Sequence, residues 1–261
     1  MISARILTLR YGRRAVLEGL DFVAKPGALT AIVGPNGSGK TTLLKALTGE
    51  VPCEGDVSVE GLDIATTPAW QLAGTRAVLP QSTPMAFPFQ AIEVVRLGLG
   101  RSVSNDTSLP HQALERVGLG GYEARFYQEL SGGEQQRVQL ARVLCQVWTP
   151  VLEGTPRWLL LDEPVSSLDI GHQLQVMEIA RDYADAGGGV IAVMHDLNLS
   201  AMFADEVALM KDGTIVVQGS PDEVLSDDNL SFAYGCTVRT RSAPVDKGWF
   251  FLPQGSSAPR L

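Results

Sequence analysis

The sequence predicts an α/β fold built around a parallel sheet. Short apolar runs that suit buried strands lie at residues 28–33, 158–161 and 190–194, and a helical stretch, residues 170–184, separates the last two. Strands and helices in that order imply a parallel sheet with right-handed crossovers. A glycine-rich segment separates the first run from another helical stretch, residues 42–48, so a tight loop is expected to join strand and helix there.

Shorter strands are expected beside this sheet. Residues 6–11 alternate apolar and polar side chains, and residues 16–23 and 55–60 also suit strands, which predicts a flanking antiparallel β layer. Further along, residues 207–210 and 214–218 lie on either side of Lys-Asp-Gly, a typical hairpin signal.

A long helical region interrupts the strands. After a short strand at residues 77–81, the pattern from 91 to 147 is helical, which predicts a helical subdomain at about residues 85–150 inserted in the core. We expect a single domain over residues 1–245, followed by a frayed tail at 246–261.

Length and composition fit a protein with a substantial core. The chain has 261 residues, 45% of them hydrophobic, and its net charge of −8 disfavours electrostatic binding of nucleic acid. Cys53, Cys145 and Cys236 form no CxxC pair, which favours buried thiols over a zinc site. There is no signal-peptide pattern, and no apolar run approaches the ~18 residues of a membrane span. We therefore expect a cytosolic protein that reaches a membrane only through a partner.

The glycine-rich segment has the pattern of a phosphate-binding loop. Gly34-Pro35-Asn36-Gly37-Ser38-Gly39-Lys40-Thr41-Thr42 reads G-x-x-x-x-G-K-[ST] between a strand and a helix. Its glycines let backbone N–H groups point at phosphate oxygens, Lys40 would reach the β- and γ-phosphates, and the Thr41 hydroxyl would bind Mg²⁺. A plain glycine-rich turn is the alternative, and this pattern arises by chance in on the order of one chain in a hundred.

Two carboxylates follow the second apolar run. Asp162 and Glu163 end the strand formed by residues 159–161, and a parallel strand delivers its last residues to the ligand crevice of the sheet. Asp162 would hold Mg²⁺ directly or through water, and Glu163 would act as general base on the attacking water. Alternatively, the pair caps the strand end or the following helix, but the phosphate loop favours the functional interpretation.

A third stretch opens a helix with a capping box. In Leu130-Ser131-Gly132-Gly133-Glu134-Gln135-Gln136-Arg137-Val138, Ser131 and Glu134 have the spacing of a box that begins a helix through Cys145. The two glycines leave N–H groups open to an anion, which the helix dipole favours. From the residues alone, a well-capped helix start and an anion site remain equally open.

This third stretch resembles the signature sequence of ATP-binding cassette (ABC) ATPases, and other elements follow in that family's order. Gly34–Thr42 is similar to its Walker A loop and residues 159–163 to its Walker B strand. Single residues that match the family are Tyr11 (adenine stacking), Gln81 (Mg²⁺ and partner sensing), Ser167-Leu168-Asp169 (D-loop) and His195 (switch histidine). The resemblance covers about residues 1–225 and implies a P-loop NTPase (RecA-like) core.

Taken singly, three of these residues have ordinary explanations. Gln81 is otherwise a loop residue, His195 a structural histidine, and Tyr11 an aromatic that packs on a strand. Two positions depart from the family, Val165 in place of threonine and Ser167 in place of alanine. Neither is a catalytic ligand in the family, so we expect activity to survive both.

The resemblance implies a homodimer that closes around two ATP molecules with Mg²⁺. Metal ligands would be Thr41, Gln81 and Asp162, and the hydrolytic residues Glu163, His195 and Gln81. The ATP held by one copy would also contact residues of the second copy, namely Ser131, Gly132, Gly133, Glu134 and Asp169.

The absence of fused membrane spans favours the transport engine of an importer, peripheral on the cytoplasmic face of the inner membrane. It would bind a permease, act indirectly with a substrate-binding protein and bind no nucleic acid. The competing class is a soluble ABC ATPase of repair or translation, but such proteins usually carry coiled-coil insertions, zinc modules or two cassettes.

Finer resemblance bears on the cargo. Residues 77–89 and 195–199 look like the iron-siderophore, haem and cobalamin importer subfamily, and the connector at 146–158 is most similar to haemin importer ATPases. Haem is thus the expected cargo, with ferric siderophore or cobalamin as alternatives; the connector also reads as a tolerated surface insertion. Permease contact is expected at residues 81–95, where Met85, Phe87 and Phe89 form either a docking groove or part of the core.

Overall fold

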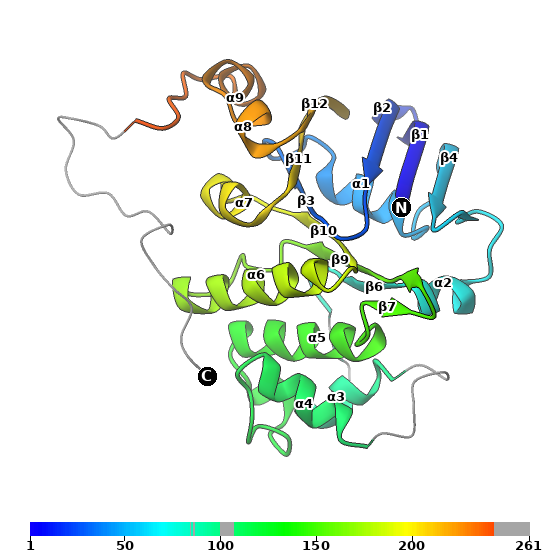
Figure 1. Ribbon diagram of the computed structural model, residues 1–261, viewed down its shortest axis with the longest axis vertical. Coiled ribbons are helices and arrows are strands. Elements are labelled where there is room, and N and C mark those ends of the chain that lie inside the picture. Colours follow the sequence, from blue (N-terminus) through cyan, green and yellow to red (C-terminus); the bar gives the residue numbers. More distant parts are fainter. Residues whose placement is uncertain (84, 86, 100–106, 243–261) are drawn as a thin grey trace.

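The computed structural model describes residues 1–83, 85, 87–99 and 107–242, and a six-stranded sheet lies at its centre (Figure 1). The strand order is β12-β11-β3-β10-β9-β6, with β3, β6, β9, β10 and β11 parallel and β12 antiparallel to β11. The bounds are Leu29–Val33 (β3), Arg76–Leu79 (β6), Trp158–Asp162 (β9), Gly189–Val193 (β10), Glu206–Lys211 (β11) and Thr214–Gly219 (β12). The predicted parallel sheet and terminal hairpin are confirmed.

Side chains of the central strands alternate between two buried faces. Along β9, Leu160 packs with α1 (Lys40–Leu47) and the antiparallel layer, whereas Leu159 and Leu161 pack with the helices on the other face. That second face is covered by α6 (Ile170–Asp185), α7 (Leu197–Phe203), α8 (Pro221–Val224) and α9 (Asp227–Tyr234). Because both faces are covered, the strands read as continuous apolar runs.

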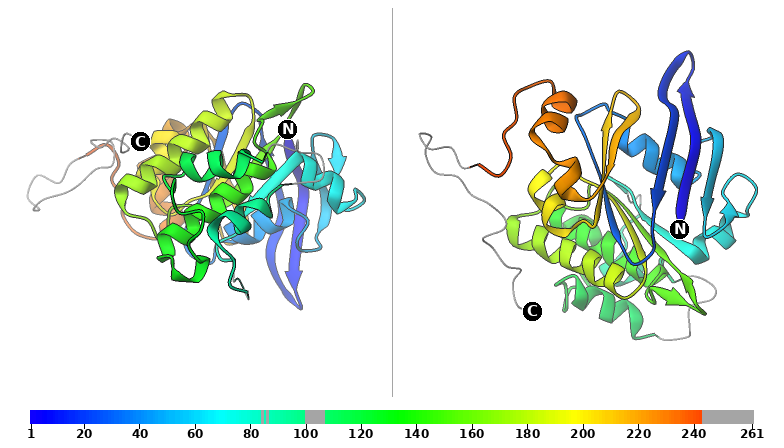
Figure 2. Two further views of the ribbon diagram at one scale, coloured as in Figure 1. Left: turned by 90° about the horizontal axis from the view of Figure 1, so that it is seen from below. Right: turned by 45° about the horizontal axis from the view of Figure 1, so that its top comes forward.

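The predicted antiparallel layer is also present, and it lies on the side of the molecule away from the helices between β6 and β9 (Figure 2). Its order is β2-β1-β4-β5, with bounds Ile2–Tyr11 (β1), Arg14–Ala24 (β2), Glu54–Val59 (β4) and Leu62–Asp63 (β5). Leu7 and Leu9 are buried as their alternation predicts, but Tyr11 is 55% exposed. The pairing of β1 with β2 shifts register after Leu9, which ends the alternation before Tyr11.

Residues between β6 and β9 form helices that gather at the lower end of the molecule in Figure 1. They are α3 (Ala91–Arg96), α4 (Leu109–Arg116), the 3-10 turn η1 (Tyr127–Glu129) and α5 (Gly132–Gln146). Their buried residues, such as Val95, Leu114 and Val138, belong to the same core as Leu159 and Leu161 of β9. The helical insertion is therefore packed continuously with the sheet.

Several smaller elements have no counterpart in the sequence interpretation, among them β5 and the helices α7, α8 and α9. The connector after α5 folds into a hairpin, β7 (Val151–Leu152) with β8 (Thr155–Pro156), and α2 (Ala69–Thr75) precedes β6. The expected tail at 246–261 lies outside the described residues. Within the part of the chain that is described, no helix combines the length and apolarity that a membrane crossing requires.

Candidate nucleotide site

The phosphate-loop segment leads from β3 directly into α1. Gly34, Gly37 and Gly39 have φ values of +149°, +79° and +102°. The reasons for glycine differ: a Cβ at Gly34 would lie 2.2 Å from the carbonyl oxygen of Met210, while one at Gly37 would meet nothing within 4 Å. The loop thus needs glycine at one position for space and at the other for backbone conformation.

Two polar side chains of the loop are buried and incompletely paired with protein. Lys40 Nζ donates to the carbonyl oxygens of Gly34 (2.8 Å) and Pro35 (3.1 Å), while the Ser38 hydroxyl is buried without a hydrogen-bond partner. Burial lowers the pKa of Lys40, and the charges of Glu163 and Asp162 oppose this shift. A buried hydroxyl without a partner beside a lysine is the environment that an oxygen-rich anion satisfies.

The two carboxylates at the end of β9 occupy different environments. Asp162 is buried and accepts a 3.1 Å hydrogen bond from the hydroxyl of Thr41. Burial raises the pKa of Asp162, the Thr41 hydrogen bond lowers it, and the charge of Glu163 raises it further. The hydroxyl and carboxylate oxygens that meet here are the hard ligands that Mg²⁺ prefers.

Glu163 is held from both sides. Gln81 Nε2 donates to one carboxylate oxygen at 2.9 Å, and His195 Nε2 lies 2.6 Å from the other. The backbone N–H of Glu163 donates to the carbonyl of Val193 on β10, and its φ of +52° lies in the left-handed region. The side chain is 14% exposed, so its carboxylate is fixed at the edge of a pocket rather than free in solvent.

That pocket has a volume of about 700 Å³ and contains most of the residues predicted to bind the chain's own nucleotide. Its lining is formed by Arg14, Val16, Asn36, Gly37, Gly39, Lys40, Thr41, Thr42, Gln81, Glu163 and His195. Sequence reasoning missed Arg14 and Val16, which carry no motif and reach the loop only because β2 passes beside it. Tyr11, Gly34, Pro35, Ser38 and Asp162 are outside this lining, although Lys40 contacts Gly34 and Pro35.

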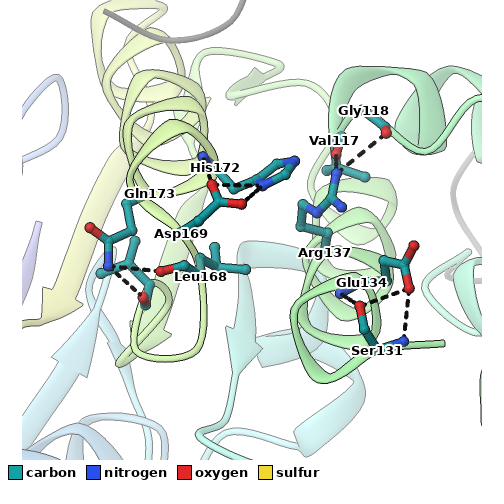
Figure 3. Close-up of polar contacts among 10 residues, drawn as sticks. Val117, Gly118, Ser131, Glu134, Arg137, Leu168, Asp169, His172 and Gln173 are labelled. Atoms are coloured by element: carbon teal, nitrogen blue, oxygen red, sulfur yellow. Dashed lines mark hydrogen bonds and ion pairs between the residues drawn. The ribbon is translucent and has the colours of Figure 1, made fainter. Parts of the chain in front are cut away.

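The signature residues lie elsewhere in the same copy. Figure 3 shows the start of α5, with Ser131 and Glu134, across from the start of α6 with Asp169. Ser131 and Glu134 form the predicted capping box, in which the Ser131 N–H and hydroxyl donate to Glu134 at 2.8 and 2.7 Å. These contacts, the hydroxyl's foremost, lower the pKa of Glu134. None of the residues expected to meet the partner's nucleotide lines the 700 Å³ pocket.

Asp169 caps α6. It accepts hydrogen bonds from the His172 N–H (3.0 Å) and from the His172 ring (2.9 Å), which lower the pKa of its carboxyl. Its charge also acts on Arg137 of α5, whose guanidinium donates to the carbonyls of Val117 and Gly118 (Figure 3). The carboxylate at the start of α6 thus interacts electrostatically with a buried arginine of α5.

Comparison with known proteins gives the family that the sequence motifs resemble. The family described as "ABC transporter" matches residues 17–166. The hemin import ATP-binding protein HmuV of Jannaschia sp. (strain CCS1) is 59% identical over 255 residues, 97% of this chain and 94% of that protein. The protein of the same name from Roseobacter denitrificans (strain ATCC 33942 / OCh 114) is 55% identical over 257 residues, 98% of each chain.

Solved structures agree in fold. A nucleotide-free ATP-binding cassette from an ABC transporter has a TM-score of 0.76 at 22% identity, over 90% of this chain and 98% of that one. An ABC transporter in an inward-facing conformation has a TM-score of 0.72 at 23% identity, over 90% of this chain and 89% of that one. The predicted P-loop NTPase fold is thereby confirmed. With the family match and the identity to the relatives, the chain belongs to the ABC transporter family.

Proposed function

We propose that this chain is the ATP-hydrolysing subunit of an importer that takes up haem through a membrane permease. The observation that carries the ATPase assignment is that Lys40 and the phosphate loop line the same pocket as Glu163, Gln81 and His195. Haem is proposed because relatives named hemin import ATP-binding protein are 51–59% identical over nearly the whole chain.

Binding of the nucleotide uses groups that are poorly satisfied without it. Phosphate oxygens would accept from the Ser38 hydroxyl, which has no partner, and from Lys40, which would leave the carbonyls of Gly34 and Pro35. The bound phosphate charge compensates the desolvation that lowers the pKa of Lys40 and so keeps the amine protonated. Tyr11 is exposed and available to stack on adenine.

The residues present fit a magnesium ion. Thr41, Asp162 and Gln81 would supply the oxygen ligands. When bound, the ion neutralises phosphate charge as it builds up during transfer. Without it, the Thr41 hydroxyl is the only hydrogen-bond donor recorded for the Asp162 carboxylate among the described residues.

Glu163 would take the proton of the attacking water. Its carboxylate lies at the pocket edge, oriented by Gln81 on one oxygen and His195 on the other. A base fixed in this way needs little reorganisation, and removal of such a base typically costs about 10²–10⁴-fold in rate.

The signature residues would act on the nucleotide of a second copy. Ser131 and Glu134 at the start of α5 lie across from Asp169 at the start of α6 (Figure 3). The absence of Ser131, Gly132, Gly133, Glu134 and Asp169 from the lining of their own chain's pocket supports a role at a neighbour's site. ATP would favour the closed homodimer because the open form lacks these contacts. The dimer would sit on a permease at the cytoplasmic face of the inner membrane, with docking at residues 81–95, where Phe87 is 67% exposed.

Met85 and Phe89 have a different environment from Phe87. Both are partly buried against the main core, so core packing accounts for them, and Phe87 is the side chain open to a permease. The helices inserted between β6 and β9 would form the subdomain that makes this contact.

The test uses tagged Glu163→Gln, in which the isosteric amide cannot accept the proton. We expect ATP binding to persist, hydrolysis to fall at least about 100-fold, and an ATP-dependent dimer to appear by light scattering. Glu178→Gln, which changes an exposed glutamate of α6, is the matched control and should hydrolyse normally. Normal turnover in Glu163→Gln would refute the assignment of the base.

The same protein identifies the partner and cargo. Purified from its own cell with ATP, it should retain a polytopic membrane protein detectable by mass spectrometry. The wild-type chain, reconstituted with that membrane protein, should hydrolyse ATP faster when a haem-loaded binding protein is added. Stimulation by a siderophore-loaded or cobalamin-loaded protein instead would move the cargo to those alternatives, and recovery of ribosomal or nucleic-acid partners would exclude import.

A further inference from the structure

The backbone of Glu163 is contacted by a side chain from a distant helix. Gln136 of α5 points its amide at the segment that follows β9, and Nε2 donates to the carbonyl oxygen of Glu163 at 3.0 Å. The other end of the amide, Oε1, accepts a hydrogen bond from the hydroxyl of Ser167. A three-residue chain thus runs from Ser167 through Gln136 to Glu163.

This contact falls where the chain needs support. Glu163 has a φ of +52°, a left-handed conformation that non-glycine residues rarely adopt, so surrounding contacts must hold it. Its N–H is bound by the carbonyl of Val193, while its carbonyl is bound by the Gln136 amide and by the Ser166 hydroxyl at 3.2 Å. Loss of the amide would leave this carbonyl to the hydroxyl and the N–H of Ser166 (3.4 Å) and so weaken the restraint that keeps the carboxylate at Gln81 and His195.

The carbonyl of Glu163 fixes which end of the Gln136 amide faces it, and Ser167 binds the other end. A carbonyl oxygen only accepts, so the NH₂ end of Gln136 must face it, and the carbonyl end must then face Ser167. A serine hydroxyl donates to that oxygen, whereas alanine would leave it without this partner. Ser167 is also one of the two positions that depart from the family, so this chain adds a restraint to its own D-loop.

We propose that Gln136 is a positioning residue for ATP hydrolysis, that it holds Glu163 in the left-handed conformation that presents its carboxylate, and that the Ser167 hydroxyl anchors the Gln136 amide by donating to its oxygen. The inference rests on the proposed function, in which Glu163 is the base. It gives Ser167 a supporting role and agrees with the expectation that activity survives a change at this position.

Steady-state ATP hydrolysis tests the proposal with Gln136→Met, which keeps the length of the side chain but removes both hydrogen bonds. We expect kcat to fall about tenfold with KM for ATP within twofold, because the phosphate loop is untouched. Ser167→Ala should lower kcat about threefold, and Ser167→Thr, which keeps the hydroxyl, should restore it.

A double variant tests whether Ser167 affects hydrolysis through Gln136 or independently of it. If Ser167 acts only through Gln136, the double variant Gln136→Met/Ser167→Ala should have the same kcat as Gln136→Met alone. If the two residues act independently, the two reductions in kcat should multiply. Multiplying effects would overturn the role assigned to Ser167.

The matched control is Gln146→Met on the same helix. Gln146 Nε2 also donates to backbone carbonyls, of Ala73 (2.9 Å) and Arg76 (3.0 Å), but far from Glu163 in the fold. It should keep kcat within twofold, even if its melting temperature falls as much as that of Gln136→Met. Equal losses of kcat in both variants would make the effect structural and overturn the proposal.

The experiments distinguish failure of the positioning role of Gln136 from failure of Glu163 as the general base. Unchanged kcat in Gln136→Met, or a loss that falls on KM, would overturn the positioning role alone. Normal hydrolysis by Glu163→Gln would remove the base on which the proposal rests. Ser167 is exposed, so Ser167→Ala provides a readout even if Gln136→Met fails to fold.

Discussion

The hydroxyl of Thr41 donates a 3.1 Å hydrogen bond to Oδ1 of Asp162 and joins residues 121 positions apart in the sequence. It connects the first turn of α1 to the carboxyl end of β9. Asp162 is only 3% exposed, and burial raises the pKa of its carboxyl despite this hydrogen bond. The site therefore holds a carboxylate that destabilises the protein until a cation arrives.

Asp162→Asn should stabilise the protein without nucleotide. A carboxyl whose pKa is raised on folding releases its proton less readily when folded, so stability is lost as pH rises from its ordinary pKa through the raised value. Asparagine keeps an acceptor for Thr41 and removes the buried charge. We expect the melting temperature at neutral pH to rise about 2–4 °C, or about 1 kcal/mol.

Calorimetry across pH provides the control for Asp162→Asn. The gain should vanish at pH values below the ordinary aspartate range, where the wild-type carboxyl is protonated in both states. The variant should also lose magnesium-dependent hydrolysis. A lower melting temperature at neutral pH would contradict the account of a costly buried charge.

Gly34 and Gly37 should differ in their tolerance of alanine. At Gly37 the methyl group meets nothing within 4 Å and only the left-handed φ of +79° opposes it, which costs about 1–2 kcal/mol. At Gly34 the same group would lie 2.2 Å from the backbone oxygen of Met210, which cannot move freely. We expect Gly34→Ala to lose at least about 3 kcal/mol in urea unfolding, and equal losses would be inconsistent with this clash.

Lys40→Ala should weaken ATP binding at least about tenfold, which is the loss of about 1.4 kcal/mol. Among the described residues, the Lys40 amine donates hydrogen bonds to carbonyls of its own loop, and its burial lowers its pKa. We therefore expect its removal to leave the melting temperature within about 2–4 °C of wild type. Titration with a fluorescent nucleotide measures the affinity, and Lys25→Ala, which changes an exposed lysine, is the control. An unchanged affinity in Lys40→Ala would be evidence against this phosphate site.

Ser131→Ala and Ser220→Ala form a matched pair of capping-box variants. Both serines begin helices with a glutamate three residues later, and loss of such a cap costs about 1 kcal/mol. If Ser131 also contacts the partner's nucleotide, only Ser131→Ala should weaken ATP-induced dimerisation in the Glu163→Gln background. Equal ATP-induced dimerisation in the two variants would show that Ser131 only caps its helix and does not contact the partner's nucleotide.

Much of the site follows from local sequence. The phosphate loop, the strand that ends in Asp162 and Glu163, and the capping box of α5 each lie within about ten residues. Spacing along a short segment fixes their geometry, because one strand, one turn or one helix start decides where such side chains point. The resemblance to ABC ATPases added Gln81 and His195, which local pattern alone left as ordinary residues.

The tertiary structure decided which of these segments meet. Gln81 and His195 are 82 and 32 residues from Glu163, and their contacts with its carboxylate depend on the order β10-β9-β6 in the sheet. Arg14 enters the pocket because β2 passes the loop, and Gln136 reaches Glu163 because α5 packs against β6, the strand next to β9. No periodicity distinguishes Gln136 from Gln146 on the same helix. The sequence alone determined the chemistry that each segment offers, and the packing of segments against one another decided which groups act together, because contacts between distant residues depend on strand order and side-chain fit.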